Sequence, residues 1–146
     1  MKVKNLFLCL AMAAMAMFSV SCDDDVKSSD VPAPIMTTFQ KMFPNTTAQW
    51  EKENHGQLKA DFNFDYHEME VWFQNDGTWV RTKKDISANE MPQKVLNYME
   101  ANYKGVEIDD MDWVESPTEK YYLVELDRDN RKDIYLKFSE EGELIE

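Results

Sequence analysis

Cysteine is nearly absent from this chain, which has two in 146 residues. Cys9 lies inside an apolar N-terminal run, and Cys22 directly follows that run. If this segment is removed and Cys22 carries a lipid, no thiol remains for a disulfide or for a cysteine-based metal site. We therefore expect a fold that is held together by side-chain packing alone.

Glycine and positive charge are also scarce. Four glycines leave no phosphate-binding loop, and no G-x-S-x-G motif or histidine-activated Ser or Thr is present. The 28 Asp and Glu outnumber the 16 Lys and Arg, which gives a net charge of −12. Such a surface repels nucleic-acid phosphates and anionic lipid headgroups. We expect no nucleic-acid partner, no cofactor and no enzymatic activity.

A long apolar run, residues 6–20, follows Lys2 and Lys4. It is shorter than the ~20 residues of a membrane-spanning helix and is typical of a signal peptide. A small residue before Cys22 resembles a lipoprotein processing site, so we predict a signal peptide over 1–21 and lipidation of Cys22. The alternative is ordinary cleavage that leaves Cys22 as a free thiol. Lipoprotein processing would leave 28 acids against 14 bases, because it removes only the two lysines.

Residues 22–33, CDDDVKSSDVPA, are polar and acidic and predict a flexible tether. Three aspartates directly after Cys22 resemble an export tag that carries some lipoproteins to the outer face of the Gram-negative outer membrane. We expect an exported outer-membrane lipoprotein displayed at the cell surface. If the aspartates are only a solvated linker, the protein faces the periplasm instead.

Residues 34–146 show helical and strand periodicity in turn. One apolar stripe predicts a helix within PAPIMTTFQKMFP (32–44), and Pro92 and Gly105 delimit a second over 91–105. Alternating apolar and polar residues, or a tryptophan beside charged residues, predict strands. These segments are AQWEKE (48–53), QLKADFNF (57–64), HEMEVWFQ (67–74), TWVRT (78–82), MDWVE (111–115), KYYLVELD (120–127) and KDIYLKFS (132–139).

The order of these segments predicts one unit used twice, over about 34–86 and 87–146. FQNDGTWV (73–80) aligns with FSEEGELI (138–145) at a shift of 65 residues. Each unit would be a helix followed by an antiparallel meander, with both helices on one face of an antiparallel sheet. The predicted fold class is therefore α+β.

The Asn-Asp-Gly sequence before Thr78 predicts a three-residue hairpin loop. This loop would pair Phe73 with Trp79 on the helix-facing side and Trp72 with Val80 on the opposite side. By the alignment of the two units, Leu144 should face the helices as Trp79 does.

The repeated pattern resembles a known family. Each half has a helix with a proline at its start, a tryptophan strand, ADF (60–62) or VEL (124–126), and a strand–acidic turn–glycine–strand hairpin. With the lipoprotein signal, this resembles the PepSY-like, β-lactamase-inhibitor-like secreted proteins over residues 33–146. The resemblance implies an α+β domain whose helices pack on one sheet face. It also implies that the concave opposite face is the surface for a protein partner.

Candidate binding residues are those that alternation places on the outer sheet face, with Lys59 and Asp61 at the rim. They are Trp72, Val80, Glu70, Tyr121, Leu123 and Lys137. The functional hypothesis is a non-enzymatic, lipid-anchored envelope module that contacts a protein or peptide, with inhibition of a secreted hydrolase as one form. The alternative is a structural or accessory envelope lipoprotein whose sheet face mediates self-association.

No metal site is predicted. His55 and His67 lie beside turns, and nothing selects Glu68 and Glu70 as their companions in so acidic a chain. DRDNRKD (127–133) lacks the glycine and glutamate of a calcium loop and contains three basic residues. The acidic run EIDDMD (107–112) predicts a solvated face rather than a calcium site.

Overall fold

The computed structural model describes residues 25–128 and 131–146. Cys22 and the expected signal peptide lie outside the described residues. The fold is α+β, as expected, with an eight-stranded antiparallel sheet in the order β1-β2-β3-β4-β5-β6-β7-β8. The helices are α1 (Ala33–Met42) and α2 (Gln93–Asn102). The strands are β1 (Asp25–Val26), β2 (Gln49–Lys52), β3 (Leu58–Phe64), β4 (His67–Phe73), β5 (Trp79–Asp85), β6 (Glu107–Glu115), β7 (Lys120–Asp127) and β8 (Ile134–Phe138).

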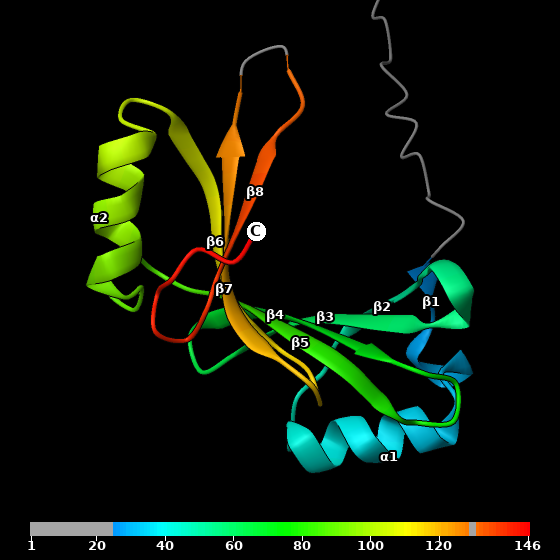
Figure 1. The fold of residues 1–146 in the computed structure, drawn as a ribbon. Coiled ribbons are helices and arrows are strands. Elements are labelled where there is room, and N and C mark those ends of the chain that lie inside the picture. The colour runs from blue at the N-terminus through cyan, green and yellow to red at the C-terminus, as the bar shows by residue number, and fades with distance from the viewer. Residues whose placement is uncertain (1–24, 129–130) are drawn as a thin grey trace, which may run out of the picture.

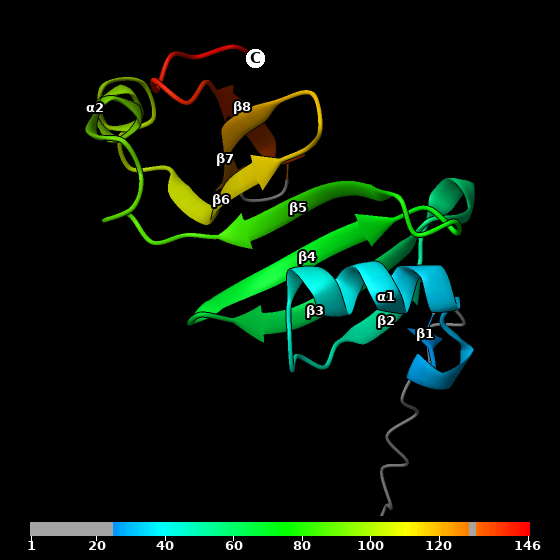
Figure 2. The ribbon, with the colours of Figure 1, turned by 90° about the horizontal axis from the view of Figure 1, so that it is seen from below.

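The sheet bends strongly where β5 meets β6, so that its two halves form a corner (Figures 1 and 2). Both helices lie on the convex side of this corner: α1 against β2–β5, and α2 beside β6–β8. Neither α-helix of the described residues lies on the concave side (Figure 1). Each half has its own hydrophobic core beneath its helix.

The first core forms around Phe39 of α1. Ile35 and Phe39 are one helical turn apart on the stripe predicted from the sequence, and both are fully buried. The Phe39 ring packs edge-on against Trp50 and Phe62, with ring centroids 5.2 and 5.0 Å apart. These contacts fix α1 across the first half of the sheet. The helix ends at Met42, before Pro44, which cannot continue it.

The second core has Val95 and Met99 of α2 against β7 and β8. Pro92 caps α2 at its N-terminus, and the helix ends at Asn102, three residues before the predicted stop at Gly105. Phe138 is fully buried and stacks edge-on with Tyr98 at 5.4 Å. Among the described residues, no helix has the length and apolar character needed to cross a membrane.

The β4–β5 hairpin has the predicted loop, with Gly77 at a φ of +87°. Phe73 pairs with Trp79 as expected, but Trp72 pairs with Arg81 rather than with Val80. The prediction was wrong because a β-bulge inserts Val80 as an extra residue that stands opposite no residue of β4.

Three other expectations need correction. The predicted tether over 22–33 is folded from residue 25 onward, since β1 pairs with β2 and Val31 is buried in the first core. Strand β6 begins at Glu107, four residues before the predicted strand. Leu144 forms a bridge with Phe138 but is 43% exposed, because the segment after Gly142 makes only this single bridge and does not continue as a strand.

Candidate binding face on the concave side of the sheet

The first half of the concave face is largely charged, because side chains alternate between the core and the concave side along each strand. On β3, Ala60 and Phe62 are buried in the core while Lys59 and Asp61 lie on the concave side. Cross-strand pairing continues this row through Glu70 of β4. Further along the sheet, β5 and β6 add Lys83 and Asp112 to the concave side, whereas β7 and β8 add Tyr121, Leu123 and Lys137.

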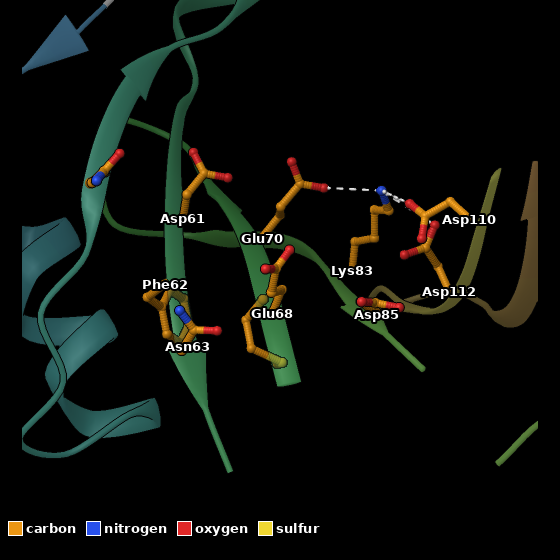
Figure 3. Close-up of a pocket in the computed structure, with 11 residues that line it drawn as sticks. Asp61, Phe62, Asn63, Glu68, Glu70, Lys83, Asp85, Asp110 and Asp112 are labelled. Atoms are coloured by element: carbon orange, nitrogen blue, oxygen red, sulfur yellow. Dashed lines mark hydrogen bonds and ion pairs between the residues drawn. The ribbon is translucent and has the colours of Figure 1, made fainter. Parts of the chain in front are cut away.

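A pocket of about 380 Å³ lies in the corner of the concave face. We call it the acidic pocket, because six of its lining residues are carboxylates and Lys83 is its one cationic lining residue among those described. Its lining residues are Gln49, Asp61, Phe62, Asn63, Glu68, Met69, Glu70, Lys83, Asp85, Asp110 and Asp112 (Figure 3).

Lys83 lies between the two halves of the sheet (Figure 3). Its Nζ atom is 3.3 Å from Glu70, 3.1 Å from Asp110 and 3.3 Å from Asp112. Burial opposes the charged form, but these three carboxylates outweigh it and raise the pKa of Lys83 above its ordinary value. Lys83 is therefore a permanent cation that joins β4 of the first half to β6 of the second.

Lys59 is the second cation of the concave face. Its Nζ atom lies 3.0 Å from Glu51, 3.4 Å from Asp61 and 3.3 Å from Glu70. Burial opposes its charge, yet these carboxylates raise its pKa. Glu70 is shared by Lys59 and Lys83, so the two ion-pair groups form one continuous network.

Asp112 is the most deeply buried acid of the pocket, with 2% of its surface exposed. Its Oδ2 atom contacts Lys83, while Oδ1 has no hydrogen-bond partner among the described residues. Burial raises the pKa of Asp112 to about 7; Lys83 opposes this rise, and Asp110 adds to it. The acidic run 107–112 is therefore not simply a solvated face, because Asp112 belongs to a closed corner of the sheet.

The pKa of Asp61 is also raised, by a smaller amount than that of Asp112. Burial raises its pKa, although the charge of Lys59 opposes this shift. Its Oδ2 atom is near Lys59 but accepts no hydrogen bond among the described residues. Two acids of the pocket thus keep an unsatisfied oxygen atom, which is uncommon for buried polar groups.

Trp72 lies on the concave side, but its ring is not exposed to solvent. Only 6% of its surface is exposed, and the Arg81 guanidinium lies 4.0 Å above its ring. Its neighbours across the strands are Lys59 and Arg81. Expecting an exposed ring was wrong because long basic side chains cover aromatic faces with their stems and charged groups.

The other predicted residues are half-buried. Lys137 lies 4.0 Å above the ring of Tyr121 and 2.7 Å from Glu119. Leu123 stands between Asp112 and Lys137 in the cross-strand pairing. The structure therefore separates the candidates: Glu70 lines the acidic pocket, Tyr121, Leu123 and Lys137 share the second half of the sheet, and Val80 lies in the bulge.

Neither histidine lines the acidic pocket. His55 is exposed in a short 3-10 helix. His67 contacts the Asp85 carbonyl and lies 3.3 Å from Glu90. In the part of the chain that the structure describes, no group of three His, Cys, Asp or Glu side chains is close enough to hold a metal ion.

Sequence reasoning missed Lys83, Asp85, Asp110 and Asp112 as members of one site. The available signal was a set of charged residues spaced two apart on each of four strands: Lys59 and Asp61, Glu68 and Glu70, Arg81, Lys83 and Asp85, and Asp110 and Asp112. Registering these strands against one another would have brought the charges together. The bend that closes the pocket leaves no comparable mark in the sequence.

The chain matches known proteins in family and in fold. Residues 56–146 match the family described as "Putative beta-lactamase-inhibitor-like, PepSY-like". A BLIP-like protein from Bacteroides fragilis NCTC 9343 is 30% identical with a TM-score of 0.68, covering 79% of this chain and 84% of that chain. No curated protein matches this chain.

Two similar structures are DUF2874 family proteins. One, from Bacteroides uniformis ATCC 8492, is 27% identical with a TM-score of 0.70, covering 79% of this chain and 86% of that chain. The other, from Bacteroides ovatus ATCC 8483, is 26% identical with a TM-score of 0.70, covering 79% and 84%. This chain therefore belongs to the PepSY-like, β-lactamase-inhibitor-like family.

Proposed function

We propose that this protein is an exported, lipid-anchored and non-enzymatic binding module that contacts a protein or peptide through its concave sheet face. The observation that carries the proposal is the position of the helices. Both cover the convex side, and neither α-helix of the described residues covers the bent face opposite them (Figure 1). A concave, half-buried and charged surface is suited to gripping a protruding segment.

The family description supports an inhibitor-like role. A fold alone does not transfer an activity, so the argument must rest on the face itself. The concave face combines ion pairs with Tyr121 and Leu123, a mixture typical of the polar and aromatic surfaces that bind proteins. Binding to a secreted hydrolase is one form that this role can take.

Self-association through the same face is the alternative. Two copies facing each other would bring two acidic pockets together, and like charges across an interface weaken association. The charge of the concave face therefore favours a different, basic partner over a second copy.

Site-specific photo-crosslinking tests the proposal. A benzoylphenylalanine replaces Asn63, an exposed residue of the acidic pocket, or Lys41, an exposed residue of α1. We expect a crosslink to one envelope protein from position 63 and not from position 41. A crosslink between two copies of this chain from position 63 would favour self-association, and no crosslink from position 63 would contradict the binding function.

The anchor is tested separately. If Cys22 is the lipidated residue, Cys22→Ala should abolish fatty-acid labelling and release the protein from the membrane fraction. Continued labelling of the variant would refute the lipid-anchor assignment without touching the role of the concave face.

We also propose that the two halves are copies of one unit. The support is a shared contact: Gly77 packs against Pro34 at the start of α1, and Gly142 packs against Pro92 and Lys94 at the start of α2. Both glycines have positive φ values, +87° and +78°. Replacing the loop sequence 74–78 by that of 139–143 should preserve the fold, and a chimera that fails to fold would oppose the repeat.

A further inference from the structure

Two neighbouring rows of side chains cross the concave face at the acidic pocket. In the first, Asp61 pairs with Glu70 and Glu70 with Lys83, so a cation follows the two carboxylates. The second row contains Glu68 of β4, just beyond the Met69–Lys84 pair, and the Asp85–Asp112 pair. This second row contains three carboxylates and, among the described residues that line the pocket, no cation.

The carboxylates of the second row lack a full set of cationic partners among the described residues. Like charges directly opposite each other on neighbouring strands are unfavourable, and Asp85 is opposite Asp112. Neither Glu68 nor Asp85 forms an ion pair with a described residue through its carboxylate. Lys83 contacts only Oδ2 of Asp112, and the buried Oδ1 has no hydrogen bond to any residue that the structure describes.

The pocket geometry favours an organic cation over a metal ion. The described residues include no group of three side chains near enough to ligate one ion, although six carboxylates line the pocket. A volume of about 380 Å³ accommodates a side chain. Phe62 and Met69 also line the pocket, so the methylene stem of a long cationic side chain would meet apolar atoms.

We propose that the acidic pocket receives an arginine side chain of the partner, with the exposed Glu68 and Asp85 accepting hydrogen bonds from its guanidinium group and the buried Asp112 adding negative charge behind them. This inference rests on the proposed function, in which the concave face binds a protein or peptide. Arginine fits better than lysine because its five donors, spread over a planar group, can serve the carboxylates of two neighbouring strands at once. The net charge of −12 also draws a basic partner toward this face.

NMR titration of the purified protein tests the proposal with the peptide acetyl-Gly-Gly-Arg-Gly-Gly-amide. The control peptide carries citrulline, which has nearly the shape of arginine but no charge. We expect the arginine peptide to bind at least about fivefold more tightly, because charge-assisted hydrogen bonds are about twice as strong as neutral ones. The largest shifts should fall on the amides of Asp85 and Asp112.

Variants of single acids localise the site. Asp112→Asn and Asp85→Asn should each weaken binding of the arginine peptide at least about threefold. Asp109→Asn is the matched control, since Asp109 is exposed on the same strand as Asp112 and does not line the pocket. If Asp112→Asn fails to fold, the exposed Asp85 still provides the test.

Three results would overturn the inference. They are equal affinities for the arginine and citrulline peptides, shifts centred outside the pocket, and tighter binding of calcium chloride than of the arginine peptide at Asp85 and Asp112. If position 63 still gives a crosslink to an envelope protein in any of these cases, the binding function stands and only the assignment of an arginine to the pocket fails. If position 63 gives no crosslink while the arginine peptide still binds in the pocket, the protein-binding function is contradicted and the arginine pocket stands.

Discussion

The Nζ atom of Lys83 on β5 lies 3.3 Å from Oδ2 of Asp112 on β6, across the joint between the two halves of the sheet. Only four residue pairs connect β5 with β6, whereas β6 and β7 share eight. This ion pair therefore lies at the narrow connection that gives the concave face its corner. The other oxygen of Asp112 has no hydrogen-bond partner among the described residues, so the joint of the fold and the candidate site share this side chain.

The stability of the protein should depend on pH through Asp112. Burial raises the pKa of Asp112 to about 7 in the fold, against an ordinary value of 3.8. Between these values the folded protein binds more protons than the unfolded chain, so stability falls as the pH rises. We expect this carboxyl to reduce the free energy of unfolding by about 1–3 kcal/mol between pH 5 and pH 8 in urea titrations.

Asp112→Asn isolates this contribution, because the other groups near it, including Lys83, Asp85 and Asp110, remain. The variant should lose the fall in stability between pH 5 and pH 8, whereas Asp109→Asn should keep it. An unchanged pH profile in Asp112→Asn would show that this carboxyl is already ionised in the fold at pH 5.

Removing the positive charge of Lys83, which lies where β5 meets β6, should destabilise the fold. Lys83→Met leaves Glu70, Asp110 and the buried Asp112 without their shared partner. We expect a loss of about 2–4 kcal/mol at pH 8, as for other partly buried ion pairs that lose one member. Lys120→Met is the matched control, since its pair with Glu115 is at the surface, and it should leave the urea midpoint unchanged. Equal effects of the two substitutions would contradict a special role for Lys83.

Replacing Gly77 in the β4–β5 hairpin should lower the stability of the protein strongly. A Cβ atom at Gly77 would lie 2.7 Å from the Pro34 backbone, at a φ of +87°. We expect Gly77→Ala to cost about 2–4 kcal/mol, since it adds a steric clash to the backbone strain. Gly105 has a similar φ of +80° but nothing within 4 Å of the added atom, so Gly105→Ala should cost only about 1 kcal/mol. Thermal unfolding of both variants measures the difference, and equal losses would contradict the packing argument.

Arg81 should protect Trp72 from solvent. Arg81→Gln removes the guanidinium that lies 4.0 Å above the ring and should lower stability by about 0.5–1 kcal/mol. The indole N–H of Trp72 should then exchange faster with solvent in NMR measurements. The indole N–H of Trp79 is an internal control, because it donates to Thr82 at 3.0 Å on the helix-facing side. Unchanged exchange at Trp72 would mean that other groups bury its ring.

Elements with a strong local signal were predictable. The apolar stripe of α1 comes from side-chain spacing, and Pro44 cannot continue a helix, so the sequence indicates α1 closely. The hairpin loop at Gly77 follows from the preference of glycine for positive φ. The pairing beyond this loop did not follow, because the bulge at Val80 depends on how both strands twist against the core.

The candidate site was predictable only in outline. Alternation indicated that Glu70, Lys59 and Asp61 share the outer face, as the strand register confirms. It gave no sign that Trp72 is covered by Arg81, or that Asp112 is buried. Both outcomes depend on side chains from neighbouring strands, and alternation within one strand carries no information about them.

The sequence by itself determined most of the helix and strand positions, the apolar face of most strands, and the family to which the chain belongs. These properties depend on local periodicity and turn chemistry, which the order of residues contains directly. Only the tertiary structure decided which charges meet. The bend between β5 and β6 brings the carboxylates of four strands into one pocket with Lys83, and the resulting burial, rather than residue type, raises the pKa of Asp112.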